Sequence, residues 1–242
     1  MNNQYMKIES ADVGNMSLFD HLQELRRRLI ICIGAVLVTS TGCYMFAEEL
    51  VRIITAPAGK LYYMNPAEAF FAYLKVALLA GILLALPLIF YHIWAFVMPA
   101  FAKTRRTASF LLVTISLILF LAGLVFSYFL VLPAGIKFFM GFATEDLQPV
   151  ISIGQYISMV ISFLLPFGFI FELPLFIIVA AHFEMISSGF LVSKRKMVIV
   201  LSFVIGAIVA PSPDVFSQAM VAIPLLVLYE ISIVVVKYIL HK

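Results

Sequence analysis

The chain has 242 residues, of which 64% are hydrophobic and 12% are charged. Soluble domains average about 25% charged and about 45–50% apolar residues, so the composition excludes an ordinary soluble enzyme, a disordered chain and a nucleic-acid-binding domain. Two cysteines are too few for a disulfide framework or a cysteine-rich zinc module. The net charge of +3 says little by itself, and the positions of the charges carry the information.

Six runs are long and apolar enough, or nearly so, to cross a bilayer, which takes about 17–25 residues in a helix. The runs are continuously apolar rather than alternating, which predicts helices and not the strands of a barrel. Length alone leaves the fifth run open to a re-entrant segment, but a basic cluster and a proline-rich turn bracket it, which favours a full crossing. In chain order the runs are 29–46, 76–98, 108–132, 157–181, 197–210 and 219–236.

The basic residues divide unevenly between the two sides of such a bundle. With the N-terminus inside, four of the 16 Lys and Arg residues fall outside: Arg52, Lys60, Lys75 and Lys137. The positive-inside rule therefore predicts that both termini are inside. Residues 1–28 are expected to form a cytoplasmic tail with an amphipathic helix, and residues 29–242 a six-helix transmembrane domain. The alternative, a cleaved signal peptide, would need an apolar region longer than the usual ~7–15 residues.

The outer loops at 47–75 and 133–156 are the longer ones. They contain helix-like amphipathic pieces, such as residues 67–73, which we expect to lie as caps on the outer face. The chain lacks the Gly-x-Ser-x-Gly, His-Glu-x-x-His and glycine-rich phosphate-loop patterns, and its four histidines do not cluster. We therefore predict no enzymatic activity, no cofactor and no metal site.

Residues 17–28, SLFDHLQELRRR, form the most organised polar segment of the sequence. Leucines recur at positions 18, 22, 25 and 29, which predicts an amphipathic helix along the inner membrane surface. Glu24 lies four residues before Arg28, the spacing of a local ion pair on a helix. Two interpretations stay open: the helix is an anchor stabilised by this pair, or Glu24 presents its carboxylate to a cationic ligand.

Two acidic residues, Glu172 and Glu230, interrupt the spanning runs. A charge at the centre of a membrane helix costs about 2.5–3.5 kcal/mol on insertion scales, so such residues face a cavity or a partner. Glu172 precedes Pro174, which bends a helix and frees carbonyl groups; the alternative is a neutral, hydrogen-bonded glutamic acid inside the bundle. Glu230 lies nearer the inner end, where it can pair on the Lys237 side of its own helix or with another helix.

The fifth run ends in a Pro-Ser-Pro-Asp sequence at 211–214. Two prolines force a sharp turn, and Asp214 can cap the start of the last run. Gln218 then lies at the membrane edge of a short helix, where a mismatch with the bilayer thickness can recruit a partner.

Four motifs carry a resemblance to a known family: His21-Leu22-x-Glu24-Leu25-Arg26-x-Arg28, Trp94-x-Phe96-x-x-Pro99-Ala100, Phe171-Glu172-x-Pro174 and Pro213-Asp214-Val215-Phe216-Ser217-Gln218. From Leu18 onward the chain resembles TatC, the multi-spanning subunit of the twin-arginine protein translocase. The resemblance implies an all-α integral membrane protein of the bacterial inner membrane. Its six transmembrane helices form a cupped bundle with a short last pair and cytoplasmic termini.

The resemblance also implies a function. TatC-like proteins bind the twin-arginine signal peptides of folded cargo, assemble single-span TatA- and TatB-type partners under the proton-motive force, and associate with further copies in the receptor complex. Glu24 matches the receptor glutamate of the family, and Glu172 matches its intramembrane glutamate. Gln218 matches the partner-binding site, to which Asp214 in the last outer turn and Glu230 are assigned. The prolines assigned structural roles are Pro57, Pro87, Pro99 and Pro174.

One departure concerns the first inner loop, where the family has a second acidic residue. Arg105 occupies that position, or Thr104 if the loop contains a gap, and the loop from 103 to 106 has no acid. Asp20 lies four residues before Glu24 and projects from the same side of the predicted helix. We hypothesise that Asp20 replaces the missing acid, and we group Arg26 and Arg105 with the same signal-peptide site.

The alternative function is a proton-coupled secondary transporter that uses Glu172. Polar residues in a proline-broken helix are typical of transporter sites. Many transporters, however, show an internal repeat between their two halves, and none is visible in this sequence.

Overall fold

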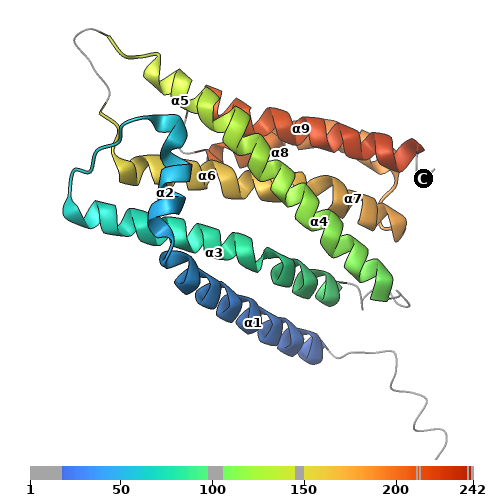
Figure 1. The fold of residues 1–242 in the computed structure, drawn as a ribbon. Helices are drawn as coiled ribbons and strands as arrows, with labels where there is room; N and C mark the ends of the chain where they lie inside the picture. The colour runs from blue at the N-terminus through green and yellow to red at the C-terminus, as the bar shows by residue number, and fades with distance from the viewer. Residues whose placement is uncertain are drawn as a thin grey trace, which may run out of the picture.

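The computed structural model describes residues 18–97, 106–144, 150–210, 212, 214–238 and 240. Over these ranges the chain is helical without a named strand, which confirms the all-α prediction. The helices are α1 (Leu18–Tyr44), α2 (Ala47–Thr55), α3 (Pro66–Val97), α4 (Arg106–Phe126), α5 (Leu132–Met140), α6 (Ile153–Phe171), α7 (Leu173–His182), α8 (Ser188–Val209) and α9 (Val215–Tyr238). α1 begins and α9 finishes at the same end of the bundle (Figure 1).

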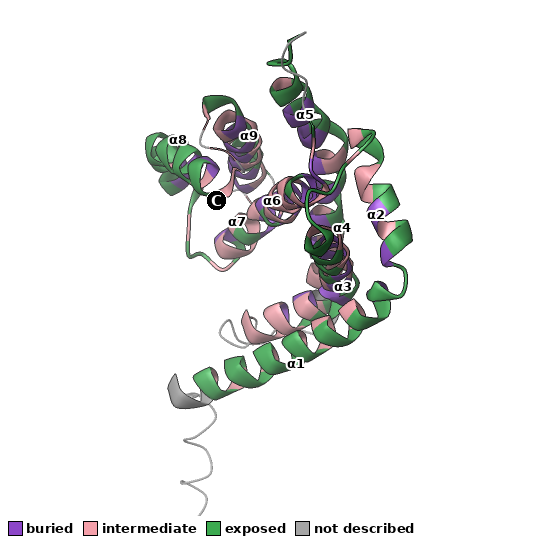
Figure 2. Cartoon of the chain, turned by 90° about the vertical axis from the view of Figure 1, so that its left-hand side faces the viewer, coloured by how far each residue is buried: buried purple, intermediate pink, exposed green. Residues whose placement is uncertain are grey.

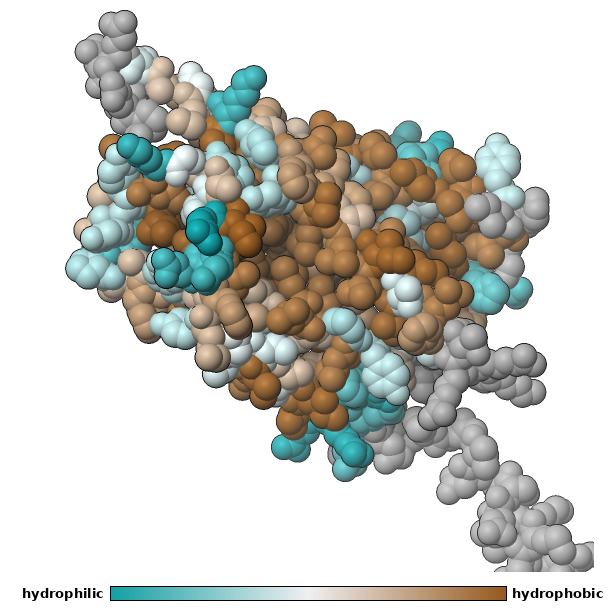
Figure 3. Space-filling view, in the orientation of Figure 1, coloured by the Kyte–Doolittle hydropathy of each residue, from teal (hydrophilic) through white to brown (hydrophobic). Residues whose placement is uncertain are grey.

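Five helical stretches of the described chain are long and apolar enough to cross a membrane: His21–Tyr44, Pro66–Val97, Ser109–Met140, Ile153–His182 and Val215–Tyr238. The third continues from α4 to α5 through a π-helical turn, η4 (Ser127–Val131). Figure 3 shows hydrophobic residues covering the middle of the bundle, with hydrophilic residues gathering toward its ends. The remaining predicted run, 197–210, lies in α8, whose basic residues 194–196 make it less apolar, and the six-span count stays a prediction.

The helices extend beyond the apolar runs that predict them. α8 and α9 contain 22 and 24 residues, fewer than the 32 of α3 but more than their apolar runs. Residues 67–73 do not form a separate cap, because no breaker divides them from the rest of α3. At 1.5 Å per residue, α3 is about 48 Å long, whereas a hydrocarbon core is about 30 Å thick. Its first turns therefore extend past the apolar layer, and α2 is the short surface helix of that loop.

Large aromatic side chains fill the core between α3, α4 and α6. Trp94, Phe120, Phe163 and Phe167 are at most 1% exposed. Phe120 packs edge-on against Phe90 with ring centroids 5.8 Å apart, a geometry that aromatic pairs prefer. Seen end-on in Figure 2, α6 lies among other helices, while α1 lies at the edge of the bundle with most of its length exposed. α1 packs against α3, and its remaining apolar faces are suited to lipid.

Small residues set the distance between neighbouring helices. A Cβ atom on Gly123 of α4 would lie 2.4 Å from the Phe167 carbonyl oxygen of α6, and one on Gly168 would lie 2.5 Å from the Phe120 ring. α1 approaches α3 in the same way, because the Thr39 hydroxyl donates to the Gly81 carbonyl over 2.8 Å. Close backbone approach at small residues is a common way for membrane helices to associate.

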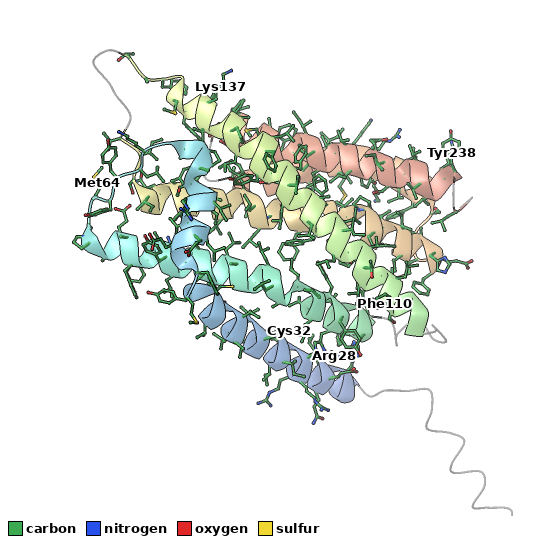
Figure 4. All side chains as sticks on the ribbon, viewed as in Figure 1. Arg28, Cys32, Met64, Phe110, Lys137 and Tyr238 are labelled. Atoms are coloured by element: carbon green, nitrogen blue, oxygen red, sulfur yellow. The ribbon has the colours of Figure 1, made fainter. Side chains whose placement is uncertain are left out.

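Hydrogen bonds join the segments that precede α3 and α6. The Tyr62 N–H donates to the Ile151 carbonyl over 3.1 Å, and the Ile153 N–H donates to the Tyr62 carbonyl over 2.8 Å. The Glu68 carboxylate accepts from the Ser152 hydroxyl and, over 2.9 Å, from the Gly154 N–H. This end, where Met64 and Lys137 lie in Figure 4, is called the Met64 end; the opposite end, where Arg28 and Tyr238 lie, is called the Arg28 end.

We predict that Gly123→Ala destabilises the bundle, because the added methyl group meets the α6 backbone rather than a flexible side chain. Overpacking of this kind typically costs about 1–3 kcal/mol. Thermal unfolding of the purified protein in detergent measures the loss. Gly34→Ala on α1 is the matched control, because a Cβ there meets nothing within 4 Å. Equal unfolding temperatures for the two variants would contradict this packing.

Candidate functional site

Near the start of α1, at the Arg28 end, Arg28 contacts both Glu24 and His92. Arg28 donates to one oxygen of Glu24, Oε1, from Nε over 3.0 Å and from Nη2 over 2.5 Å. Nη1 of the same guanidinium lies 3.3 Å from Nδ1 of His92, near the end of α3. His21 stacks on Phe96 with ring centroids 4.1 Å apart. At this end two side-chain contacts hold α1 to α3, and the local ion pair between Glu24 and Arg28 forms.

The Glu24 carboxylate keeps unused hydrogen-bonding capacity. Both bonds from Arg28 end on Oε1, and no described residue donates to Oε2. The side chains of Glu24 and Arg28 are 27% and 21% exposed, so solvent and ligands reach them. Arg26 is exposed on the same helix. The Asp20 side chain, Arg105 and Pro99 lie outside the part of the molecule that the structure describes.

A second carboxylate, Glu172, lies between α6 and α7 inside a candidate membrane span. It is 1% exposed, and no described residue hydrogen-bonds either of its carboxylate oxygens. Ser116 of α4 is a neighbouring polar group, but it does not reach hydrogen-bonding geometry with the carboxylate. The Ser116 oxygen accepts from Trp94 Nε1 over 2.8 Å, which leaves its proton available. Pro174 is buried in the first turn of α7, directly after this break.

Glu230 has a partner on a neighbouring helix. Arg195 of α8 donates from Nη2 to Oε2 of Glu230 over 2.6 Å, and both side chains are about half-exposed. The preceding residue, Tyr229, is buried, and its hydroxyl donates to the Leu191 carbonyl over 2.8 Å. Glu230 therefore joins α9 to α8, and its partner is not Lys237, whose ammonium lies over the Tyr238 ring.

Asp214 caps α9 at the Met64 end. Its Oδ1 accepts from the Ser217 N–H over 2.8 Å, and its Oδ2 accepts from the Ser212 hydroxyl. Burial acts to raise the pKa of Asp214, but these hydrogen bonds outweigh it and hold the pKa below its usual range. Gln218 follows in the next turn, half-buried. Its carbonyl oxygen would lie 2.7 Å from a Cβ on Gly206, so α8 and α9 touch closely here.

The predicted site residues do not form one site. Glu24 and Arg28 meet at one end, Asp214 and its serines lie at the other, and Glu172 is buried in the span between them. The described prolines are also separate: Pro57 lies in a short 3₁₀ turn, η2 (Ala56–Ala58), and Pro87 lies exposed inside α3. Among the described residues, no three His, Cys, Asp or Glu side chains cluster as metal ligands do.

Comparisons with known proteins identify the family. The family model described as Sec-independent protein translocase protein (TatC) matches residues 20–224. The TatC protein of Carboxydothermus hydrogenoformans is 39% identical over 231 residues, which cover 94% of this chain and 95% of that protein. The TatC protein of Aquifex aeolicus is 41% identical over 226 residues, covering 90% and 93%. This chain belongs to the TatC family.

The fold agrees with this membership. A crystal structure of the twin-arginine translocase receptor TatC superposes with a TM-score of 0.81 at 40% identity, covering 90% of this chain and 98% of that one. The chloroplastic TatC protein of Pisum sativum is 36% identical over 90% of this chain and 63% of its own length. The chain is therefore a multi-pass membrane component of a protein translocase that works with other Tat subunits, and it is not an enzyme.

Sequence reasoning missed the hydrogen bonds that Glu68 and Lys75 make with α6 and the residues before it. Lys75 donates to the Ser158 hydroxyl over 2.9 Å. Both charged residues precede the second apolar run, so the pattern assigned them to a loop. The sequence has no helix breaker between residue 66 and that run, which could have predicted one continuous helix. It places Glu68 and Lys75 two turns apart on one helix.

We predict that Asp214→Ala lowers the free energy of unfolding by about 0.5–2 kcal/mol, the usual cost of losing a helix cap. Because the folded pKa is depressed, the contribution is complete above the unfolded pKa and is lost as the pH falls through the folded pKa. Thermal unfolding at neutral and acidic pH measures both effects. Asp214→Asn keeps an acceptor and is expected to lose less. An alanine variant as stable as the parent at neutral pH would refute the capping role.

Proposed function

We propose that this chain is the receptor and core subunit of a twin-arginine translocase, and that Glu24 binds the paired arginines of the signal peptide. The observation that carries the proposal is the Glu24–Arg28 pair: the carboxylate already holds a guanidinium at 2.5 Å, and Oε2 is unused. Guanidinium groups favour carboxylates because their planar fork donates several charge-assisted hydrogen bonds. Two arginines in sequence can therefore use both oxygens of this carboxylate.

Binding of the signal peptide would exchange one guanidinium for another. An incoming arginine can take Oε2 directly, and it takes Oε1 by displacing Arg28. Arg28 also contacts His92 of α3, so its displacement weakens one of the two contacts that hold the start of α1. Receptor occupancy is thereby coupled to the position of α1. Asp20 adds a second negative charge on this helix, in place of the missing loop acid, and Arg26 and Arg105 orient the peptide.

The proposed topology places the Arg28 end in the cytoplasm. The start of α1, the start of α8 and the last turns of α9 meet at this end (Figure 1). Basic residues of these segments support the orientation: Arg26, Arg28, Arg195 and Lys237. In this arrangement α8 is the fifth of six crossings of the bacterial inner membrane. Residues 1–28 are the cytoplasmic tail, and residues 29–242 are the transmembrane domain.

The remaining polar residues are proposed to assemble TatA- and TatB-type single-span partners, and further copies of the chain, under the proton-motive force. Glu172 supports this role because it is buried without a hydrogen-bond donor among the described residues. A polar group in that state gains strongly from an incoming partner. Gln218 lies beside the Asp214 cap at the start of α9, and Glu230 lies nearer its other end. We expect a partner helix to pack on α9 between these two polar positions.

We predict that Glu24→Gln weakens binding of a twin-arginine signal peptide by about tenfold or more, since hydrogen bonds to charged groups are worth about 1.5–3 kcal/mol. Fluorescence anisotropy of a labelled peptide with the purified protein in detergent measures the change. Glu49→Gln is the matched control, because Glu49 is an exposed acid on α2 at the other end of α1. The same peptide with two lysines is expected to bind weakly to the parent protein.

Equal capture of the arginine and lysine peptides would overturn the receptor role itself. A Glu24→Gln protein that still discriminates between them would instead move the recognition site away from α1.

We predict that Asp20→Ala also weakens signal-peptide binding, but less than the change at Glu24. Carboxylates at i and i+4 lie about 5–6 Å apart at Cβ and repel each other by a few tenths of a kcal/mol, which a dication relieves. Site-specific crosslinking of the signal peptide to the two variants measures the difference. Unchanged crosslinking in Asp20→Ala, together with its loss in a Glu24 variant, would eliminate Asp20 from the site.

A further inference from the structure

Two adjoining cavities lie along the contact between α3 and α6 in the half of the bundle nearer the Met64 end. The larger has a volume of about 850 Å³, and its walls combine apolar side chains with polar ones, including Glu68, Gln155 and Ser152. The smaller has a volume of about 320 Å³ and mostly apolar walls. Three residues line both cavities, so the two spaces meet at them: Lys75, Ser158 and Ser162.

Lys75 is a cation with unused hydrogen-bonding capacity at this junction. Its ammonium group has three donors, and the contact found among the described residues is the one to the Ser158 hydroxyl. It is not part of either ion pair in the described chain. The nearby Glu68 does not neutralise it, because that carboxylate accepts from Ser152, Met64 and Gly154 at the end of the helix.

The apolar cavity continues from Lys75 toward the middle of the bundle. Its walls repeat at the same helical spacing on both sides: Leu78, Leu79 and Ile82 follow Lys75 on α3, and Ile161, Ser162 and Leu165 follow Ser158 on α6. Residues at i+3, i+4 and i+7 share one face of a helix. The two faces therefore form the walls of a trough about 10 Å long at 1.5 Å per residue, with the cation at its mouth.

We propose that this trough binds one anionic phospholipid, with the phosphate on Lys75 and an acyl chain along the apolar walls. The position favours a lipid, because Lys75 directly precedes the apolar run 76–98 and so lies where headgroups meet the hydrocarbon. The free donors of the Lys75 ammonium can form charge-assisted hydrogen bonds with the phosphate oxygens of an anionic headgroup. Charge at the mouth and apolar walls below match the two parts of a phospholipid, whereas a soluble anion would leave the walls unused.

The lipid site is independent of signal-peptide binding, which lies at the opposite end of α3. A lipid held there would fill the space between α3 and α6 and would contribute packing that side chains do not supply. It would also connect the polar serines of the larger cavity to the membrane surface through its headgroup.

The test is a titration of the delipidated, purified protein in detergent, followed by native mass spectrometry and by thermal unfolding. The probes are dioleoyl phosphatidylglycerol and dioleoyl phosphatidylcholine, which differ in net charge and share their acyl chains. The variants are Lys75→Gln, which loses the charge, Lys75→Arg, which keeps it, and Ser162→Phe, which fills the trough. Lys137→Gln is the matched control, since Lys137 is an exposed cation of α5 at the same end.

We expect the parent protein, Lys75→Arg and Lys137→Gln to bind phosphatidylglycerol equally and more tightly than phosphatidylcholine. Lys75→Gln should bind it about fivefold more weakly, which corresponds to the ~1 kcal/mol that a basic residue contributes at a membrane surface. Ser162→Phe should weaken binding of both lipids. Its unfolding temperature without lipid should stay near that of the parent, because the side chain enters an open cavity.

Three results would overturn the proposal. Equal affinity of the parent for the two lipids would remove the role of charge, and undiminished binding by Lys75→Gln would place the headgroup elsewhere. Competition by deacylated glycerophosphoglycerol as strong as that by the whole lipid would show that the trough holds no acyl chain. If Lys75→Gln unfolds in detergent alone, Ser162→Phe decides the outcome, and undiminished lipid binding by that variant refutes the site.

Discussion

The lack of water across the apolar middle of the bundle is the constraint on which the structure depends. Each backbone N–H and carbonyl there must find its partner within the protein, and a helix satisfies them inside one segment. Serine and threonine side chains obey the same constraint: Thr114, Ser202 and Ser232 each donate to the carbonyl four residues earlier. With polar groups satisfied locally, the helices associate through close contact, which explains the small residues at α1–α3, α4–α6 and α8–α9.

The break between α6 and α7 is the exception to this rule. Glu172 directly follows α6, and α7 begins with Leu173 and Pro174. Because Pro174 has no N–H, the regular backbone bonding is interrupted where a carboxyl group is also buried. A stable bundle gains nothing from a buried carboxyl group without a donor. The cost is understandable if the group meets its partner only during transport. The aromatic core around it, with Trp94 bonded to Ser116, keeps the surrounding helices in place.

Much of the fold could be predicted because lipid imposes a simple pattern. The apolar runs located five spanning helices, and the spacing of Glu24 and Arg28 anticipated their pair. Hydropathy did not predict the parts of helices that continue beyond the membrane. The second apolar run begins at residue 76, whereas α3 already begins at Pro66. That error hid Glu68 and Lys75. The partner of Glu230 also could not be chosen, since selecting Arg195 over Lys237 depends on how α8 lies against α9. The predicted orientation already separated Glu24 on the inner surface from Asp214 in the last outer turn, and the structure places them at opposite ends of the bundle.

The Glu68 cross-link has a mechanical consequence. Glu68, near the start of α3, is tied to Ser152 and Gly154, which lie 84 and 86 positions later in the chain. Two backbone hydrogen bonds of Tyr62 reinforce this link. At the other end the buried Tyr229–Leu191 bond joins α9 to α8, but the start of α1 is held to α3 by the contacts of Arg28 with His92 and of His21 with Phe96, none of them fully buried. α1 is therefore held less firmly at the Arg28 end than α3 is held at the Met64 end. Local opening is expected where such contacts are few, so a signal peptide bound at the proposed Glu24 site would pull on the more compliant end of α1.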